Sequence, residues 1–164
     1  MKKSLLLLLF AVVSMSSYAQ FEKGTKYVGA SLTALNLSYS SGEKFGMGLE
    51  AVGGYFFADS WMLTGRLEYR HEWKAAPAPD INSVALGAGA RYYFVQNGIY
   101  LGAGFQYQHV ASKVDYIQLP LEVGYCFYLN HYVSIEPAIY YNLCLNKFSD
   151  GSKVGFKLGL GFYF

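Results

Sequence analysis

The sequence predicts an all-β fold: an eight-stranded antiparallel up-and-down β-barrel that spans a membrane, preceded by a cleaved signal peptide. Apolar and polar residues alternate with a period of two along most of the chain after residue 20, which is typical of strands with one apolar face. Charged residues make up 15% of the chain, against about 25% in soluble domains. After residue 20 no apolar run is long enough for a membrane-spanning helix, so a closed barrel is the remaining way to cross.

Residues 1–19 have the composition of a secretory signal peptide. Lys2 and Lys3 precede an apolar run, and Ala19 ends a small-x-small cleavage site. The apolar run is shorter than the roughly 20 residues of a membrane anchor. We therefore expect a signal peptide over 1–19 and one barrel domain over 20–164. Removal of Lys2 and Lys3 reduces the 13 basic residues to 11, which equals the 11 acidic ones, so the charge gives no indication of nucleic-acid binding.

Four strands are expected in the first half of the domain, over 25–39, 45–57, 61–71 and 82–94. The first strand changes phase at Leu35, which indicates a bulge. The second carries Glu50 on its polar face. In the third, every second residue from Thr64 to Arg70 is polar. The fourth sets apolar residues against Ser, Gly and Arg91, so each strand has one polar and one apolar face.

Four further strands are expected over 99–110, 115–129, 132–147 and 153–164. The fifth has glycines on its polar face, and the sixth and seventh alternate from Ile117 and Val133 onward. These two strands contain Pro120 and Pro137, where we expect bulges or sites without a ladder hydrogen bond. The eighth strand, KVGFKLGLGFYF, places apolar residues on one face up to Phe164.

The polar faces decide which side of the barrel is buried. A secreted soluble barrel would turn its apolar face inward, and a membrane barrel turns it toward lipid. The polar faces carry too few charges for an exterior in water, namely Glu50, Arg66, Glu68, Arg70, Arg91, Glu122, Glu136 and Lys157. Four are acidic and four basic, as a closed interior that pairs its charges requires. We expect a network of salt bridges that fills the lumen, or alternatively a narrow polar path beside the inward glycines.

The chain resembles the small eight-stranded outer-membrane β-barrels of Gram-negative bacteria, the porin-like or opacity-type family, over its whole length after the signal peptide. Barrels of this family end in a signal that the barrel-assembly machinery reads, and the matching positions here are Lys157, Gly159, Phe162 and Phe164. The resemblance implies a bacterial outer-membrane location with both termini in the periplasm. It also implies contact with outer-membrane lipid and lipopolysaccharide, a monomer, and no cofactor, metal or nucleic acid.

The family implies a non-enzymatic protein with a structural role in the envelope or limited passage of small solutes. One alternative is a narrow porin-like channel. Another is a lipid-modifying enzyme, because His109, Ser112 and Glu122 resemble the residues of outer-membrane lipid A deacylases. The spacing here is His-x-x-Ser, whereas those enzymes have His-x-Ser. We expect Cys126 and Cys144 to be free, since the register of their hairpin separates them by roughly 30 Å.

Overall fold

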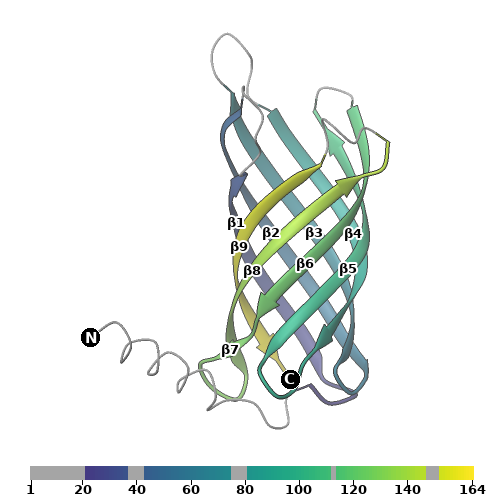
Figure 1. The fold of residues 1–164 in the computed structure, drawn as a ribbon, viewed down its shortest axis with the longest axis vertical. Coiled ribbons are helices and arrows are strands. Elements are labelled where there is room, and N and C mark those ends of the chain that lie inside the picture. The colour runs from purple at the N-terminus through teal and green to yellow at the C-terminus, as the bar shows by residue number, and fades with distance from the viewer. Residues whose placement is uncertain (1–20, 37–42, 75–80, 112–113, 147–151) are drawn as a thin grey trace, which may run out of the picture.

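The computed structural model describes residues 21–36, 43–74, 81–111, 114–146 and 152–164. In these residues the chain forms one antiparallel sheet that curves into a barrel, with strands inclined to the barrel axis (Figure 1). The strand segments are β1 (Lys26–Asn36), β2 (Glu43–Ala58), β3 (Trp61–Lys74), β4 (Ile81–Tyr93), β5 (Ile99–Val110), β6 (Val114–Tyr125), β7 (Phe127–Tyr128), β8 (Val133–Cys144) and β9 (Lys153–Tyr163).

The order of the strands closes the sheet. That order is β6-β5-β4-β3-β2-β1-β9-β8-β7, and an additional pairing of β6 with β8 joins its two ends. β7 continues β6, because Gly124 lies opposite Ala138 and Phe127 lies opposite Ile135 in one register. The 9 segments of the described chain, less one for the divided strand, therefore make eight barrel strands. The predicted eight-stranded antiparallel up-and-down barrel is confirmed.

The two prolines inside strands interrupt the ladder without shifting it. Pro137 lies in β8, across from the break at Cys126 that separates β6 from β7. Pro120 lies in β6 beside a gap of the β5–β6 ladder, where the two residues between Ala103 and Gln106 are not paired with β6. Proline has no backbone N–H to donate to a neighbouring strand. Of the two expected outcomes, the structure therefore has gaps in the ladder and no bulge at these positions.

The first strand contains the irregularity that its sequence predicts. The register of β1 against β9 shifts between Ala34 and Asn36, which confirms the bulge expected at Leu35. β1 ends at Asn36, and the rest of the strand expected over 25–39 lies outside the described residues.

Two expected boundaries are corrected by the structure. β3 runs on to Lys74, so Glu72, which was expected in a loop, lies within a strand. The strand expected over 115–129 is divided into β6 and β7. The predicted signal peptide over 1–19 lies outside the described residues.

Both ends of the described chain lie at the same end of the barrel, which we call the lower end. The N–H of Ser60, in the turn after β2, donates to the carbonyl oxygen of Phe21, and the N–H of Lys26 at the start of β1 donates to that of Phe164. Figure 1 marks the C-terminus at this end. The turns at this end are short and cover residues 59–60, 94–98 and 129–132. At the opposite end, which we call the upper end, the strands lead into residues that the structure does not describe.

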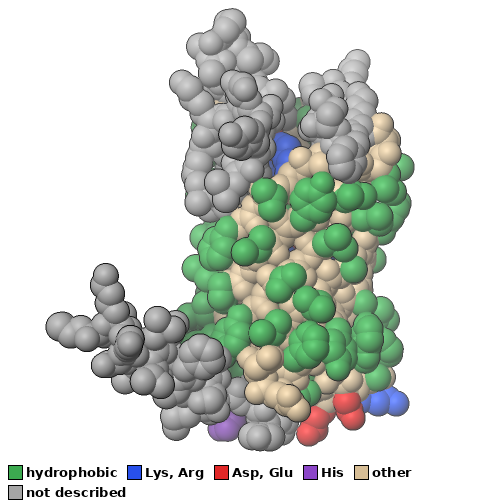
Figure 2. Space-filling view, viewed as in Figure 1, with side chains coloured by type: hydrophobic (Ala, Val, Ile, Leu, Met, Phe, Trp, Pro, Cys, Tyr) green, Lys and Arg blue, Asp and Glu red, His purple; other side chains and the backbone are tan. Residues whose placement is uncertain are grey.

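The outer wall of the barrel is apolar. Leu86 is 66% exposed and Ile139 is 62% exposed, and Figure 2 shows hydrophobic side chains spread over the visible face of the barrel. Along each strand these outward residues alternate with buried ones, as in β5 and β9. Among the residues that the structure describes, no helix is long and apolar enough to cross a membrane.

Aromatic side chains on the outer wall gather near both ends. Those that are exposed near the lower end are Tyr55, Phe57, Trp61, Phe94, Tyr132, Phe162 and Phe164. Those that are exposed toward the upper end are Tyr69, Trp73 and Tyr107. Two bands of this kind are typical of barrels whose middle lies in lipid.

The close approach of β4 and β5 gives a test of the packing. A Cβ atom at Gly89 would lie 2.5 Å from the carbonyl oxygen of Ala103, whereas one at Gly65 on the outer wall would meet nothing within 4 Å. We expect Gly89→Ala to lower the free energy of unfolding by about 1–3 kcal/mol, because backbone atoms must move apart. Gly65→Ala is the matched control and should leave it nearly unchanged, as measured by denaturant titration of the refolded barrel. Equal effects of the two substitutions would contradict this packing.

Candidate functional site in the barrel interior

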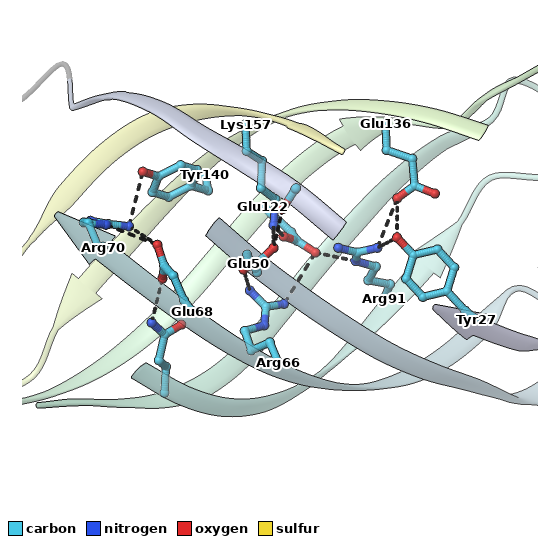
Figure 3. Close-up of polar contacts among 12 residues, drawn as sticks. Tyr27, Glu50, Arg66, Glu68, Arg70, Arg91, Glu122, Glu136, Tyr140 and Lys157 are labelled. Atoms are coloured by element: carbon cyan, nitrogen blue, oxygen red, sulfur yellow. Dashed lines mark hydrogen bonds and ion pairs between the residues drawn. The ribbon is translucent and has the colours of Figure 1, made fainter. Parts of the chain in front are cut away.

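The interior of the barrel holds the eight charged side chains that the alternation of the sequence assigns to polar faces. Each is only 2–5% exposed. They are Glu50 on β2, Arg66, Glu68 and Arg70 on β3, Arg91 on β4, Glu122 on β6, Glu136 on β8 and Lys157 on β9. Figure 3 shows them in successive groups along the barrel, with their side chains directed toward one another.

The central group is built around Glu122. Its carboxylate lies 2.5 Å from Nζ of Lys157, 2.5 Å from Nε of Arg91 and 3.5 Å from Nη2 of Arg66. The carboxylate of Glu50 lies next to it, 2.9 Å from Nζ of Lys157 and 3.8 Å from Nη1 of Arg66. The two carboxylates therefore share Lys157 and Arg66, and Glu122 alone also contacts Arg91. The three cations come from three different strands, so the group links opposite sides of the barrel (Figure 3).

The group toward the lower end is built around Glu136. Its Oε1 accepts hydrogen bonds from the hydroxyls of Tyr163 at 2.7 Å and Ser134 at 2.8 Å. Its Oε2 accepts one from Tyr27 at 2.8 Å and lies 3.3 Å from Nη1 of Arg91. Arg91 thus bridges the central and lower groups, and every oxygen of Glu136 has a partner.

The group toward the upper end is built around Glu68. Arg70, two residues along the same strand, contacts its Oε1 at 2.5 Å, and Gln106 donates to its Oε2 at 3.1 Å. The guanidinium of Arg70 also lies 5.8 Å from the centre of the Tyr140 ring, a distance suited to a cation–π contact. This group lies between the central group and the upper end of the barrel.

One further ion pair was not predicted from the sequence. Glu72, which was expected in a loop, is buried, and the ammonium group of Lys153 contacts its carboxylate. The signal was available, because Glu72 continues the two-residue spacing of Arg66, Glu68 and Arg70. The pair extends the charge network of the lumen toward the upper end.

The space left in the interior is small. Two cavities of about 10 Å³ each lie beside the central group and are lined in part by Glu50 and Lys157. A cavity of this size holds about one water molecule. The buried atoms Nε of Arg66, Oγ1 of Thr33 and Oγ1 of Thr64 have no hydrogen-bond partner within the described chain. Single waters therefore suit the cavity that Thr33 and Arg66 line.

A much larger hollow, of about 620 Å³, is lined mainly by outward-facing residues, among them Trp61, Leu121 and Ile139, and it also touches the interior residues Glu122 and Tyr140. Its surface is apolar and continuous with the rest of the outer wall, so it is suited to lipid chains.

The residues of the expected assembly signal are divided between the inner and outer faces of the last strand segment. Lys157 and Gly159 are buried in the interior, whereas Phe162 and Phe164 are exposed on the outer wall at the lower end. Lys157 therefore belongs both to the expected signal and to the central charge group.

The residues that resemble a lipid A deacylase do not form one site. The side chain of His109 is 60% exposed and contacts Asp115 at 2.7 Å, whereas Glu122 is buried in the lumen. The pairing of β5 with β6 places them about seven residues apart along the strand, which is roughly 23 Å. Ser112 lies outside the described residues. Among the described residues there is also no group of three side chains suited to a metal ion, and Cys126 and Cys144 are free, as expected.

The closed eight-stranded barrel, its apolar wall and its paired interior are features of a protein that crosses a membrane as a β-sheet. The family model described as "Outer membrane protein beta-barrel domain" matches residues 5–164. The chain belongs to this outer-membrane β-barrel family. The fold, the apolar outer wall and the family together describe a bacterial outer-membrane barrel.

Solved structures of other bacterial proteins have a similar fold. Neisserial surface protein A (NspA) matches with a TM-score of 0.60 and 21% identity, over 85% of this chain and 96% of that one. The N-terminal barrel domain of Pseudomonas aeruginosa OprF matches with a TM-score of 0.64 and 16% identity, over 87% and 98%. Yersinia pestis Ail in a nanodisc matches with a TM-score of 0.59 and 15% identity, over 87% and 100%. No curated protein matches the sequence.

The central group gives a test of the charge network. We expect Glu122→Gln to lower the free energy of unfolding by about 3–5 kcal/mol, because three buried cations lose a shared carboxylate. The matched control is Asp115→Asn, which removes a carboxylate that is 51% exposed and should have little effect, since exposed pairs contribute little. Denaturant titration in the same detergent measures both. A loss no larger for Glu122→Gln than for Asp115→Asn would contradict the network.

Proposed function

We propose that this outer-membrane barrel is a non-enzymatic structural protein of the bacterial envelope and that its lumen does not conduct ions. The observation that carries the proposal is the interior formed by the described residues, where the two cavities beside the paired charges of the central group measure about 10 Å³ each. The non-enzymatic part is supported by the separation of exposed His109 from buried Glu122, which speaks against the deacylase alternative.

A closed lumen is favoured over a narrow channel by the cost of parting buried ion pairs. An ion that crossed the centre would have to separate Glu122 from Lys157 and Arg91, which lie 2.5 Å from it. Breaking such a pair leaves an uncompensated buried charge and costs several kcal/mol. The two cavities hold about one water each, and neither is large enough for a hydrated ion. Limited passage of small solutes is therefore less favoured than a purely structural role.

We infer the orientation of the barrel in the membrane from the lengths of its turns. Outer-membrane barrels have short periplasmic turns and longer outer loops, and the lower end has short turns over 59–60, 94–98 and 129–132. We therefore place the lower end, with both termini, in the periplasm. The upper part of the wall would then contact lipopolysaccharide, and the lower part would contact phospholipid.

The partners proposed for the chain are few. Lys157, Gly159, Phe162 and Phe164 would be read by the barrel-assembly machinery during insertion. Once inserted, the barrel is proposed to be a monomer that contacts lipid and lipopolysaccharide and binds no nucleic acid.

The conductance of the chain from Gln20 to Phe164 in a planar bilayer tests the closed lumen. We expect no steady openings from protein that is shown to be folded by its heat-dependent mobility on a gel, because the ion pairs block the path. A trimeric porin in the same bilayer serves as the positive control. Steady openings that change when Arg66 or Glu122 is replaced by Ala would overturn the proposal and support the narrow channel.

An arginine on the outer wall tests whether the wall faces lipid. Leu86 lies near the middle of β4 and Leu129 lies in a lower turn; they are 66% and 55% exposed. In phospholipid vesicles we expect Leu86→Arg to lower the free energy of unfolding by about 2–4 kcal/mol and Leu129→Arg by about 0–1 kcal/mol, because the cost depends on depth. Similar small effects of both substitutions would mean that the wall does not lie in lipid.

A further inference from the structure

The lower mouth of the barrel is lined by aromatic rings that belong to different strands. Phe56 lies on β2, Tyr93 on β4, Tyr128 on β7 and Tyr163 on β9. Phe56, Tyr93 and Tyr163 are at most 2% exposed. These four rings, which we call the socket, surround a position that no strand of the barrel fills.

That position is filled by Phe21, which lies before the first strand. Its ring stacks on Tyr93 with ring centres 4.3 Å apart. The other three rings of the socket, those of Phe56, Tyr128 and Tyr163, lie 6.0, 5.9 and 6.2 Å away. Phe21 is only 4% exposed, although its neighbour Glu22 is exposed. The chain therefore turns one aromatic side chain into the mouth and leaves the next residue outside.

Backbone hydrogen bonds hold this segment across the mouth. The N–H of Ser60 donates to the carbonyl oxygen of Phe21 at 2.7 Å, and the N–H of Gly24 donates to Phe56 at 2.8 Å. The N–H of Lys23 donates to the side chain of Asp59 at 2.9 Å. Residues 21–25 precede β1. The carbonyl oxygen of Thr25 still accepts a hydrogen bond from the N–H of Phe56 on β2 at 2.9 Å, so the segment that can move without opening the ladder is 21–24.

The socket lies directly below the charge network. Tyr163 contacts the ring of Phe21 and donates its hydroxyl to Glu136 at 2.7 Å. Cys126 is packed in the same cluster, with its Sγ 3.4 Å from the Tyr163 hydroxyl. Displacing Phe21 would therefore open a way from the lower end to Cys126 and Glu136.

We propose that the lower mouth is a socket that binds an aromatic side chain of an extended peptide, and that residues 21–24 are a stopper that fills it. The stopper seals the lower mouth and can leave the socket while the barrel stays folded. This inference rests on the proposed function only in taking the lumen to be closed, and it adds a second closure below the ion pairs.

The two free cysteines report on the seal, because they lie toward opposite ends of the lumen. Cys126 belongs to the cluster at the socket, and Cys144 is the last residue of β8 toward the upper end. Both are 1% exposed. A charged methanethiosulfonate reagent is added to the refolded chain from Gln20 to Phe164, and peptide mass spectrometry follows the modification of each cysteine.

We expect Phe21→Ala, and a chain that begins at Thr25, to raise the modification rate of Cys126 by about tenfold to a hundredfold, the range expected for the burial of one phenylalanine side chain. The rate at Cys144 should not change. Glu22→Ala is the matched control within the segment and should behave as the unaltered chain does. The heat-dependent gel mobility of each variant reports whether its barrel is folded.

A synthetic peptide of residues 20–24, added to the chain that begins at Thr25, tests binding directly. We expect it to restore the protection of Cys126 as its concentration rises, and the same peptide with Phe21→Ala to fail. Continued protection of Cys126 in both altered chains, equal increases at Cys126 and Cys144, or no protection by the peptide would each overturn the stopper. These outcomes are separate from the conductance of the unaltered chain, which tests the closed lumen itself.

Discussion

The barrel depends on one constraint: charges that a closed sheet encloses must neutralise one another. Glu122 meets this constraint by contacting Lys157, Arg91 and Arg66 at once. Since these cations lie on β9, β4 and β3, Glu122 ties β6 to three strands that are not its neighbours in the sheet. The same pairing leaves cavities of only about 10 Å³ beside the central group. Stability and the proposed closure of the lumen to ions therefore rest on a single arrangement.

Glycine at chosen interior positions makes room for this arrangement. A Cβ at Gly102 would lie 2.4 Å from the side chain of Glu122, and one at Gly161 would lie 2.3 Å from that of Glu136. The carboxylates of Glu122 in the central group and Glu136 in the lower group thus lie against glycines on the neighbouring strands. The interior is filled by a few long polar side chains and by tyrosines, with glycines opposite them, as in small barrels generally.

Much of the fold could be predicted from the sequence, because the period of two is a local property of each strand. It assigns Arg66, Glu68 and Arg70 to one face and Leu67 to the other, and the change of phase at Leu35 marks the bulge. The low charge content and the lack of a long apolar run then place the apolar face outside. These signals do not depend on contacts between distant residues.

The details of the interior could not be predicted in the same way. Which cation pairs with which carboxylate depends on the register and curvature of the closed sheet, and these set how Arg91 reaches both Glu122 and Glu136. Phe21 gave no signal, because it precedes the alternation and its partners come from four strands. Glu72 is a different case. Its spacing was informative, but Pro77 and Pro79 follow it closely and favour a loop.

The two prolines reduce the number of backbone hydrogen bonds along one strand of the barrel wall. Pro120 and Pro137 face gaps on either side of the β6–β7 strand, whereas β1 and β9, where the ends of the chain meet, are paired along nearly their full length. The pairing between the first and last strands is therefore more continuous than the pairing on either side of the β6–β7 strand. A barrel forced open by heat or by a pulling force would part along the β6–β7 strand before it parted where its ends meet.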